Sequence, residues 1–457
     1  MRSMKNFSAV ILAAGAGTRM KSDLPKVLHK LSGKALASRV ISAVSKLKPD
    51  NIVVVLGHKS EEAKKELAGL GVKFAYQKKQ LGSAHALMQA GKVLKNYNGG
   101  ILVISGDVPL VKSSTLSSLV KHNKRNKSAV TVLAATVDNP FGYGRIIRAG
   151  TALEGIVEEK DATPQQKLIK EINSGIYCFD KNVWKALSKV RPDNAKKEYY
   201  ITDTVSILKK AGKKAGLLVV QDEREVKGIN NREELAQAER LLLKNKIKEL
   251  LEKGVTVIDT ENVYVSDDAE VGTDTVIYPG AFISSGVKIG KKCVIKGSCF
   301  IEDSKIGDNC EISYSYVSGA ELGKNVKIGP FAHIRPGTVL KDNVKVGNFS
   351  ETKKSVIEKN SKVNHLSYVG DAEIGEDVNI GAGTITCNYD GHKKHKTIIG
   401  AKAFVGSNVN FVAPVKVGKG ALVAAGSTIT KDIPSGTLAI ARSRQEIKRK
   451  IEKAGKS

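Results

Sequence analysis

The second half of the chain carries an aliphatic residue at every sixth position, and no other feature constrains the fold as strongly. The first run of this pattern comprises Val271, Ile277, Ile283, Ile289, Ile295 and Ile301. After two slips of frame and one interruption, the pattern ends at Ile429. A period of six suits neither an α-helix nor an independent sheet, but it is typical of a parallel β-helix in which each side of a triangular prism contributes one inward residue per hexad. We expect about nine or ten coils at a strand spacing of about 4.8 Å. Hexapeptide prisms coil left-handed, although the period itself does not fix the hand.

A polar insertion at residues 388–397 interrupts these repeats. A solenoid tolerates a protruding loop, and such loops often carry function. Cys387, His392 and His395 cluster there and suggest zinc, but their spacing is not that of a standard site and no fourth ligand is evident. We therefore interpret the insertion as a solvated loop.

Residues 1–230 alternate short apolar runs with charged, helix-favouring segments. Apolar runs lie at 9–12, 51–56, 101–105 and 129–135. This alternation predicts an α/β domain with a parallel sheet covered by helices on both faces. In such sheets ligands bind beyond the carboxyl ends of the strands.

The first apolar run leads into a Gly-rich turn at residues 13–18, which Arg19 and Lys26 follow. Small residues let a phosphate approach the backbone, and N–H groups before a helix favour an anion. The two cations could neutralise a polyphosphate. The turn does not complete a Rossmann pattern, which fails at Met20, and it lacks the Gly-Lys-Ser/Thr of a Walker loop. We therefore expect a nucleotide-binding loop of a third kind.

A helical segment separates the two halves. Apolar residues recur at helical spacing over 232–253, with Asn231 and Glu234 forming a predicted capping box and Gly254 ending the helix. The expected organisation is a first domain at 1–231, a connecting helix at 232–253, a repeat domain at 254–435 and a basic tail at 436–457.

The formal net charge of +28 raises nucleic acid or anionic ligands as partners. The lysines are spread along the whole chain without aromatic interleaving or a nucleic-acid motif, so we expect no specific nucleic-acid binding. No apolar run approaches the ~20 residues of a membrane span, and the N-terminus shows no signal-peptide pattern. Five scattered cysteines are typical of free thiols in a reducing compartment, so we expect a cytoplasmic protein.

Several motifs together indicate a family. The N-terminal half contains Leu-Ala-Ala-Gly-Ala-Gly-Thr-Arg-Met (12–20), Leu-Pro-Lys (24–26), Gly-Asp-Val-Pro (106–109), Gly-Tyr-Gly-Arg (142–145) and Glu-Ile-Asn-Ser-Gly (171–175). The C-terminal half contains Ile-Gly-Pro-Phe-Ala-His-Ile-Arg-Pro-Gly (328–337) and Asn-Ile-Gly-Ala-Gly-Thr-Ile-Thr-Cys-Asn-Tyr-Asp-Gly (379–391). From about residue 6 to 445 the chain closely resembles the bacterial family of bifunctional N-acetylglucosamine-1-phosphate uridylyltransferases/glucosamine-1-phosphate N-acetyltransferases. The resemblance implies a Rossmann-like nucleotidyltransferase domain followed by a left-handed β-helix.

The resemblance implies that the N-terminal half joins UTP and N-acetylglucosamine 1-phosphate with Mg²⁺ and releases pyrophosphate. Such a transfer requires positioning and charge neutralisation rather than a covalent intermediate. The nucleotide and sugar would be bound by Leu12, Ala13, Ala14, Gly15, Arg19, Lys26, Gln77, Gly82, Ser83, Ser105, Gly106, Asp107, Gly144, Glu158, Asn173 and Asn230. Asp107 and Asn230 would hold the metal through oxygen ligands.

Two positions depart from the family pattern. Ser105 stands where a Tyr often precedes Gly-Asp, so a contact to the nucleotide would be lost or reshaped. Ala16 stands where a Lys is common, so pyrophosphate binding would depend more on Arg19.

The resemblance further implies that the repeat half moves acetyl from acetyl-CoA to glucosamine 1-phosphate, which needs a base and oxyanion donors. His365 matches the family's base, and Glu351 is a candidate to orient its ring. The sugar phosphate and acetyl-CoA would be bound by Arg335, Lys353, Tyr368, Asn379, Ala382, Asn388, Tyr389, Ser407, Ala425 and Arg442. The implied assembly is a homotrimer with active sites between neighbouring prisms, and the product would feed peptidoglycan and lipopolysaccharide synthesis.

Three other interpretations stay open at this point. One is a single-function sugar nucleotidyltransferase with a structural prism. Another is a non-enzymatic subunit of a translation-initiation exchange factor, which shares the two-domain plan, but the presence of Arg19, Lys26, Asp107 and His365 disfavours it. The third, a basic nucleic-acid binder, rests on charge alone.

Overall fold

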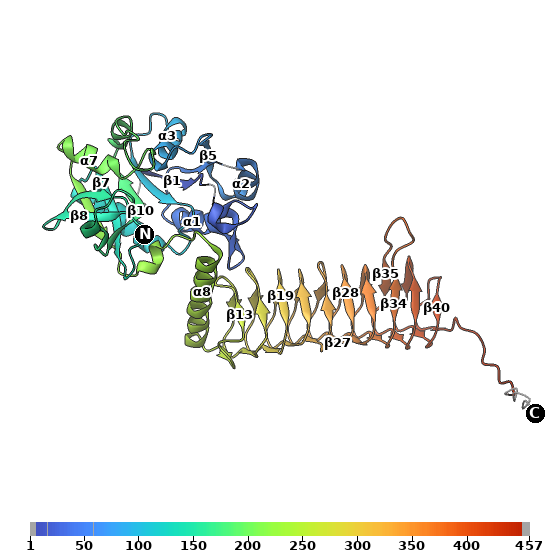
Figure 1. The fold of residues 1–457 in the computed structure, drawn as a ribbon. Coiled ribbons are helices and arrows are strands. Elements are labelled where there is room, and N and C mark those ends of the chain that lie inside the picture. The colour runs from blue at the N-terminus through green and yellow to red at the C-terminus, as the bar shows by residue number, and fades with distance from the viewer. Residues whose placement is uncertain (1–5, 16, 58, 450–457) are drawn as a thin grey trace, which may run out of the picture. The chain divides into compact units, whose positions relative to one another are not determined.

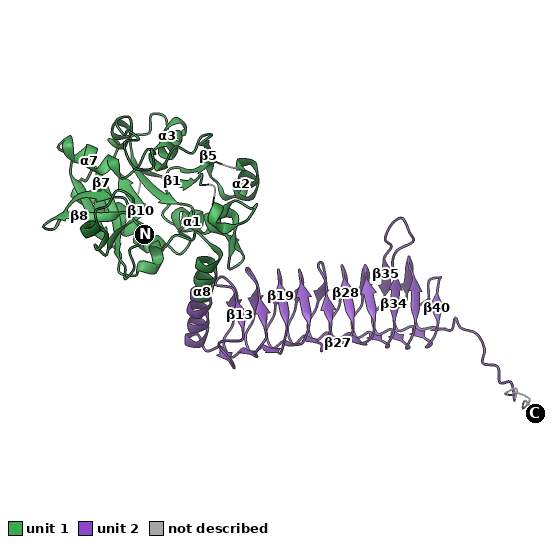
Figure 2. Ribbon diagram, in the orientation of Figure 1, with its two compact units in different colours: residues 1–240 green, residues 241–457 purple. Residues whose placement is uncertain are grey.

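The computed structural model describes residues 6–15, 17–57 and 59–449, which form parts of two compact units at 1–240 and 241–457 (Figure 2). The predicted departure at Ala16 and the last eight residues of the basic tail lie outside the described residues. The division between the units falls within helix α8 (Arg232–Glu252). Within the described residues, no helix has the length and apolarity to cross a membrane.

Helix α8 begins with a variant of the predicted capping box. The Asn231 Oδ1 accepts a hydrogen bond from the Glu234 N–H at 2.8 Å. The Glu234 carboxylate reaches back one residue further than in a standard box and accepts from the Asn230 N–H at 2.6 Å. This contact ties a predicted metal ligand to the start of the helix.

The first unit is built on a nine-stranded sheet whose main path runs β11-β7-β10-β6-β1-β4-β5. Its strands are β1 (Phe7–Ala13), β4 (Ile52–Leu56), β5 (Lys73–Tyr76), β6 (Gly100–Ser105), β7 (Val130–Thr136), β10 (Glu171–Phe179) and β11 (Ala215–Val219). Every pair on this path is parallel except the two that β10 makes with β6 and β7. The all-parallel expectation is therefore wrong for β10. A parallel return needs a long crossover, whereas β10 follows the hairpin of β8 (Arg145–Ala149) and β9 (Ala152–Val157) and the one-turn helix α5 (Pro164–Lys167).

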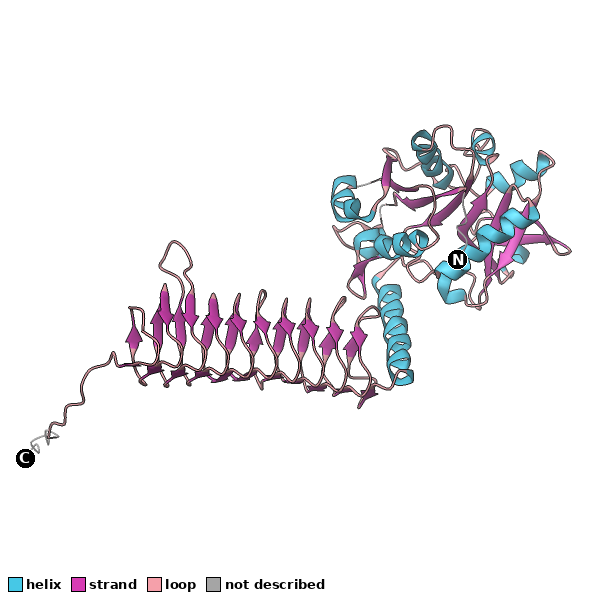
Figure 3. Ribbon diagram, turned by 180° about the vertical axis from the view of Figure 1, so that it is seen from behind, coloured by secondary structure: helices cyan, strands magenta, loops and turns pink. Residues whose placement is uncertain are grey.

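Helices cover both faces of this sheet, as predicted (Figure 3). Consecutive residues of β1 point to opposite faces, so Ile11 packs in one core and Val10 in the other. The first core receives α1 (Leu36–Ser45), α2 (Ser60–Leu67) and α4 (Ser113–Asn126); the second receives α3 (Ser83–Val93), α6 (Val183–Leu187) and α7 (Asp203–Lys210). The sheet is therefore buried on both faces, and the last residues of β1 and β4, Ala13 and Leu56, belong to the first core.

The second unit is a prism of three parallel sheets with eleven, ten and nine strands, from β12 (Thr256–Val257) to β41 (Leu438–Ala439) (Figure 1). The predicted coil number is confirmed. Ile277 pairs with Ile295, which pairs with Ile312 and so on, and these inward residues form one buried core. The step from Ile277 to Ile295 is 18 residues, but the next is 17 and the one to Ile328 is 16. Shortened corners therefore cause the slips of frame in the sequence.

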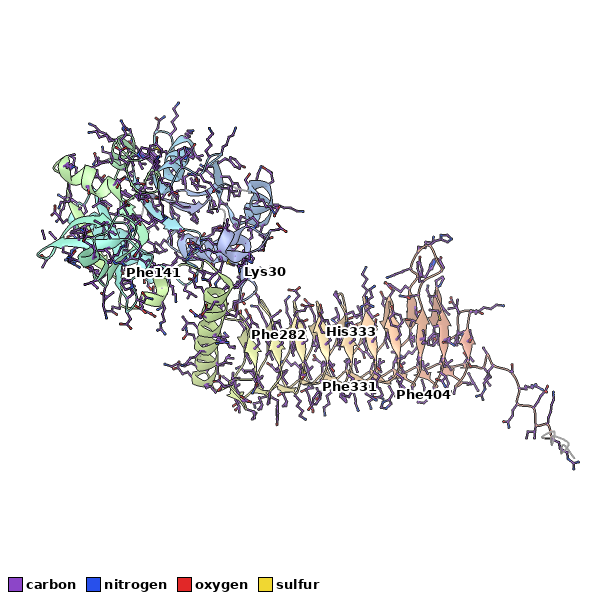
Figure 4. All side chains as sticks on the ribbon, in the orientation of Figure 1. Lys30, Phe141, Phe282, Phe331, His333 and Phe404 are labelled. Carbon is purple, nitrogen blue, oxygen red and sulfur yellow. The ribbon has the colours of Figure 1, made fainter. Side chains whose placement is uncertain are left out.

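Helix α8 packs against one end of the prism, and one face of the prism carries a column of aromatic rings. Leu243, Ile247 and Leu250 of α8 join the prism core at its first coils, as a capping element should. On the outer face of the ten-stranded sheet, Tyr264, Phe282, Phe300 and Tyr316 stack along successive coils with ring centroids 4.5–5.0 Å apart. His333 continues this column, and Figure 4 shows Phe282 and His333 on the same face.

Candidate active sites

The described residues of the Gly-rich turn, 13–15 and 17–18, follow the carboxyl end of β1, where the sequence predicts a phosphate site. The turn continues from β1 into a single turn of 3₁₀-helix, Thr18–Met20. Gly17 has a φ of 66°, and a Cβ there would lie 2.5 Å from the Lys26 Cβ, so a side chain would clash. At the end of β4, a Cβ on Gly57 would lie 2.4 Å from the Ala14 carbonyl oxygen. The turn is thus fixed against Lys26 and against β4 by close backbone approach.

The four charged or polar residues predicted to bind phosphate and metal meet beneath this turn. The Lys26 ammonium contacts the Asp107 carboxylate and donates to the Asn230 Oδ1 at 3.1 Å. The Arg19 guanidinium donates to the same Asn230 oxygen at 2.9 Å. The Ile229 N–H donates to the Asp107 carbonyl at 2.8 Å and so joins the two segments. The side chains of Lys26 and Asp107 are only 15% and 14% exposed, so their charges interact with reduced solvent screening.

This arrangement fits a divalent cation. The Asp107 and Asn230 oxygens both contact one ammonium nitrogen, so they converge on a position that already attracts positive charge. Carboxylate and amide oxygens suit Mg²⁺, which commonly takes one or two protein carboxylates and completes its shell with water and substrate phosphate. No group of three or more His, Cys, Asp or Glu that could hold a metal occurs among the described residues. The ion would therefore be shared between the protein and a nucleotide.

The residues predicted to bind the base and ribose lie where β5 leads into α3. Gln77 is buried, and its Nε2 donates to the Gly82 carbonyl at 3.0 Å. The Ser83 Oγ accepts from the Ile201 N–H at 3.0 Å, and the Gln80 Nε2 donates to the Ala14 carbonyl at 2.6 Å. A pocket of about 490 Å³ opens between this segment and the Gly-rich turn, with Thr18, Pro25, Gly57, Gln77 and Gln80 in its wall. Ser105, the departure from the family pattern, ends β6 opposite Leu12.

The three residues predicted to bind the sugar also come together. The Asn173 N–H donates to the Gly144 carbonyl at 2.8 Å, and its side-chain amide donates to the Tyr177 hydroxyl at 2.7 Å. A Cβ on Gly144 would lie 3.4 Å from both carboxylate oxygens of Glu158. Burial raises the pKa of Glu158, although a hydrogen bond from the Thr202 hydroxyl opposes the shift. A carboxyl in this setting accepts hydrogen bonds from an uncharged ligand strongly because little water competes.

Tyr200, which the sequence analysis missed, lies near enough to Glu158 for the two groups to interact, so it is a further candidate for this site. Its side chain is 7% exposed, and its hydroxyl has no hydrogen-bond partner within the described residues. Burial raises the pKa of Tyr200 to about 12, and Asp161 and Glu158 add to the shift. An unsatisfied buried hydroxyl costs about 1–3 kcal/mol, so this one has reason to bond a ligand. The only signal in the sequence was a tyrosine pair followed by Thr202 and Asp203.

Asp203 gives the first unit a testable pH dependence. Burial, then the charges of Glu158 and Asp161, raise its pKa to about 6, against about 3.9 in an unfolded chain. The folded state therefore holds this proton more tightly than the unfolded chain does. Ionisation of Asp203 thus lowers the free energy of unfolding, by an amount that is zero below about pH 4, grows as the pH rises and is complete above about pH 6. We expect Asp203→Asn to raise the Tm at about pH 8 and to leave it unchanged at about pH 4. The control is Asp138→Asn, which changes a fully exposed carboxylate, and equal gains at both pH values would contradict the explanation.

In the prism, His365 ends β30 (Lys362–His365), and its Nδ1 contacts the Oδ1 of Asn348. Asn348 ends β27 (Lys345–Asn348) directly opposite His365. The expectation that Glu351 orients the ring is wrong, because the Glu351 carboxylate instead accepts from the Arg335 guanidinium at 2.7 Å. Glu351 begins β28 (Glu351–Lys353) beyond the corner, on the next sheet, whereas Asn348 shares the sheet of His365.

The predicted acetyl-CoA residues continue the column that begins with Asn348 and His365. The Gly383 N–H donates to the His365 carbonyl at 3.2 Å, and the Asn408 N–H donates to the Ala382 carbonyl at 2.7 Å. The next coil repeats the pattern, since the Gly426 N–H donates to the Ser407 carbonyl at 2.8 Å. The Arg442 guanidinium then donates to the Ala425 carbonyl at 2.9 Å. The candidate base and the candidate cofactor residues therefore lie along one edge of the prism.

Around the corner, two cations of the ten-stranded sheet and one of the protruding loop come together. Arg335 and Lys353 lie on neighbouring coils. Lys394 lowers the pKa of Lys353 most strongly, and Arg335 adds to the effect. Lys394 belongs to the protruding loop between β34 (Ile385–Cys387) and β35 (Thr397–Ile399), visible in Figure 1. The loop contains several lysines close together, so the sequence did not indicate that Lys394 in particular would lie beside Lys353.

The loop is held by polar contacts rather than by a metal-like arrangement. The Asn388 side chain donates to the Asp371 carboxylate at 2.5 Å and to the Tyr368 hydroxyl at 3.4 Å. These two bonds attach the start of the loop to residues of the preceding coil. His395 lies 2.6 Å from the Asp390 carboxylate, and the Lys393 N–H and His395 hold the pKa of Asp390 well below its usual range. Tyr389 is exposed beside them.

Asn379 is less integrated than the other predicted residues. It begins β33 (Asn379–Ile380) on the sheet of His365. No hydrogen bond joins its side chain to the rest of the site within the part of the chain that the structure describes.

Comparison with known proteins places the whole chain in one family. The model of a MobA-like NTP transferase domain matches residues 9–175, and that of bacterial transferase hexapeptide repeats matches 319–354 and 396–431. A GMPPB C-terminal domain model matches 259–321. The bifunctional protein GlmU of Caldanaerobacter subterraneus is 50% identical over 97% of this chain and 96% of that protein. That of Thermoanaerobacter pseudethanolicus is 48% identical over the same shares. The chain belongs to the bifunctional GlmU family.

Membership of the GlmU family resolves two of the expectations. The hexapeptide match, together with three parallel sheets, confirms the left-handed parallel β-helix. The near-full-length match to bifunctional relatives also disfavours a single-function transferase and an exchange-factor subunit, because both units are shared with these relatives.

Proposed function

We propose that the chain catalyses two successive steps of UDP-N-acetylglucosamine synthesis, as other members of the GlmU family do. The prism transfers acetyl from acetyl-CoA to glucosamine 1-phosphate, and the first unit transfers uridylyl from UTP to the product. The convergence of Arg19, Lys26, Asp107 and Asn230 carries the proposal, and the column from His365 to Arg442 supports it. The product would feed peptidoglycan and lipopolysaccharide synthesis in the cytoplasm. We assign uridylyl transfer to residues 1–231, acetyl transfer to residues 254–435 and no separate activity to the basic tail 436–457.

In uridylyl transfer, Arg19 and Lys26 bind the triphosphate, and Asp107 with Asn230 holds Mg²⁺. The metal neutralises phosphate charge when bound. The sugar phosphate oxygen attacks the α-phosphorus, the bond to the bridging oxygen breaks, and pyrophosphate leaves. Gln77, Gly82 and Ser83 orient the base and ribose. Asn173, Glu158 and the unpaired Tyr200 hydroxyl hold the sugar in line for attack.

In acetyl transfer, the Nε2 of His365 accepts a proton from the substrate amine as its nitrogen attacks the thioester carbonyl. The C–S bond then breaks, and CoA leaves as its thiol after protonation. Arg335, Lys353 and Lys394 bind the sugar phosphate, since these three cations lie close together and the Glu351 carboxylate pairs with Arg335 alone among them in the described residues. Asn388 and Tyr389 lie on the loop beside the reacting carbonyl, and Arg442 binds phosphates of the cofactor.

Two separate assays on the purified full-length protein test this function. We expect thiol release from acetyl-CoA with glucosamine 1-phosphate, and pyrophosphate release from UTP with N-acetylglucosamine 1-phosphate and Mg²⁺. Chelation of the metal should stop pyrophosphate release and leave thiol release unchanged. Absence of thiol release would refute the acetyltransferase half alone, and metal-independent pyrophosphate release would refute the metal assignment.

We infer that the protein is a homotrimer. Tyr314, Phe331, Phe349 and Leu366 form a column on one edge of the prism, and each is 51–63% exposed. Each also has a positive φ of 44–59°, which is unfavourable for bulky residues. An exposed apolar column of this kind favours coverage by another protein surface. Leu366 directly follows His365, so a second copy on this edge would complete the acetyl-transfer site. Figure 4 shows Phe331 on this edge.

Phe349→Lys tests the assembly, because a charge in the middle of the column cannot be buried cheaply. We expect sedimentation to show a shift from trimer to monomer, with acetyl transfer lost and uridylyl transfer retained. Phe141→Lys, at a residue of the first unit that is 77% exposed, should leave the trimer intact. A trimeric, fully active Phe349→Lys protein would exclude this edge as the interface.

A further inference from the structure

We infer that Asn348 is the positioning residue for His365 and that its amide oxygen selects the ring tautomer in which Nε2 can accept a proton. This inference rests on the proposed role of His365 as the base of acetyl transfer. It replaces a carboxylate partner, which the sequence suggested, with a neutral amide.

The backbone holds the two residues opposite each other. Asn348 and His365 are direct partners of the adjacent parallel strands β27 and β30. The Leu366 N–H donates to the Asn348 carbonyl at 3.1 Å, and the Ser367 hydroxyl donates to the His365 carbonyl at 2.8 Å. These bonds fix both strand ends, so neither Cα can move far without breaking the coil.

The side chain of His365, by contrast, has little to hold it. It is exposed, and the contact between its Nδ1 and the Asn348 Oδ1 is its one hydrogen bond within the described ranges. An exposed imidazole without a partner samples several rotamers and both tautomers, and only a fraction of these present a basic nitrogen to the substrate. One acceptor at Nδ1 therefore greatly increases the fraction of molecules in which Nε2 is unprotonated and faces the substrate.

The chemistry of the amide decides which nitrogen is basic. An amide oxygen only accepts, so this contact requires a proton on Nδ1 and leaves the lone pair on Nε2. If the amide were turned over, its NH₂ would donate to Nδ1, the ring proton would move to Nε2, and that nitrogen could no longer act as a base. The orientation of Asn348 is thus a condition for proton transfer at Nε2.

The charged neighbours do not provide an alternative orienting group. Lys345 and Lys362 project from the same two strands, three residues before Asn348 and His365, and neither can accept a hydrogen bond. Glu351, the carboxylate that the sequence analysis suggested, is engaged by Arg335. Asp371 accepts from the Asn388 amide. Asn364 also lies on β30, but the contact to Nδ1 is made by the Asn348 Oδ1, so Asn348 is the residue whose acceptor faces that nitrogen.

Four variants of the full-length protein test the inference: Asn348→Ala, Asn348→Asp, Asn343→Ala and His365→Gln. For Asn348→Ala we expect kcat of acetyl transfer to fall about 10- to 100-fold, with the KM for glucosamine 1-phosphate nearly unchanged, because orienting partners of a functional histidine have effects of this size. Asn348→Asp keeps an acceptor, so activity should largely return, and its charge should raise the pKa of the imidazole and move the acid limb of the pH–rate profile to higher pH. Asn343→Ala removes an asparagine from an exposed ladder on the same prism and should change nothing.

The outcomes separate this inference from the function on which it rests. If His365→Gln retains acetyl transfer, the assignment of the base fails whatever Asn348 does. If His365→Gln is inactive while Asn348→Ala keeps the wild-type kcat and pH profile, only the inference about Asn348 is overturned. A third result would also overturn the inference about Asn348. If Asn348→Ala is inactive, and Asn348→Asp neither restores the activity nor shifts the pH–rate profile, the role of Asn348 is purely structural. Sedimentation of each variant as the wild-type assembly checks that the prism is folded, and pyrophosphate release checks the first unit.

Discussion

Replacement of His365 by alanine is expected to lower the kcat of acetyl transfer about 100- to 10,000-fold, which is the usual contribution of a general base. The amine of glucosamine 1-phosphate must lose a proton as it attacks the thioester, and the alanine variant leaves that proton to water. Uridylyl transfer should continue at the wild-type rate, because its residues belong to the other compact unit. Thiol release and pyrophosphate release, measured on the same preparation, separate the two effects.

The structure of the prism makes this variant a clean one. His365 is exposed, and its strand is held by backbone hydrogen bonds from Gly383 and by the buried core of the coils, so removal of the ring creates no cavity. The KM for glucosamine 1-phosphate should change little, since Arg335, Lys353 and Lys394 bind the phosphate. His392→Ala, on the exposed part of the loop, is the matched control and should retain both activities. Full acetyl transfer by His365→Ala would remove the base from the mechanism.

The inward-facing residues of the prism were predictable from the sequence because their burial depends on local repetition alone. Each Ile or Val at the sixth position enters the core whatever the neighbouring coil contains. Even the slips of frame are visible in the sequence as changes in the spacing of these residues. They correspond to corners shortened by one or two residues, as between Ile312 and Ile328. The Gly-rich turn was predictable for a similar reason, since Gly17 and Gly57 are required by close contacts near the strand ends.

Side-chain partners were harder to predict, because they depend on which residues of different coils or segments lie opposite. The ring of His365 contacts Asn348 and not Glu351, and the corner between the two sheets decides this. Lys394 and Lys353 interact although one belongs to the protruding loop and the other to the sheet, far apart in the sequence. The antiparallel direction of β10 was missed because the residues of a strand do not indicate whether it runs parallel or antiparallel to its neighbours. The length and structure of the connection that precedes the strand determine this direction.

Replacement of Asp107 by alanine is expected to lower uridylyl transfer about 100- to 1,000-fold, as the loss of one strong electrostatic contact to a transition state typically does. In the structure Asp107 is the one carboxylate in contact with Lys26, within the described residues, while Arg19 and Lys26 both bond Asn230. Its removal leaves two cations and one amide oxygen. Phosphate binding should therefore persist, whereas the negative charge that attracts Mg²⁺ is lost.

Because phosphate binding persists while metal binding weakens, Asp107→Ala should change some kinetic parameters and leave others unchanged. The KM for UTP should stay within a small factor of the wild-type value, kcat should fall, and the Mg²⁺ concentration for half-maximal rate should rise, because a metal held by Asn230 alone has lost its charged ligand. Asp138→Ala, at a fully exposed carboxylate of the same unit, should leave all three unchanged, and acetyl transfer should be normal in both variants. If Asp107→Ala instead raised the KM for UTP with an unchanged Mg²⁺ requirement, Asp107 would act by holding Lys26 for the nucleotide and not by holding the metal. Only the metal-binding role predicts that added Mg²⁺ restores the rate, so one titration decides between the two roles.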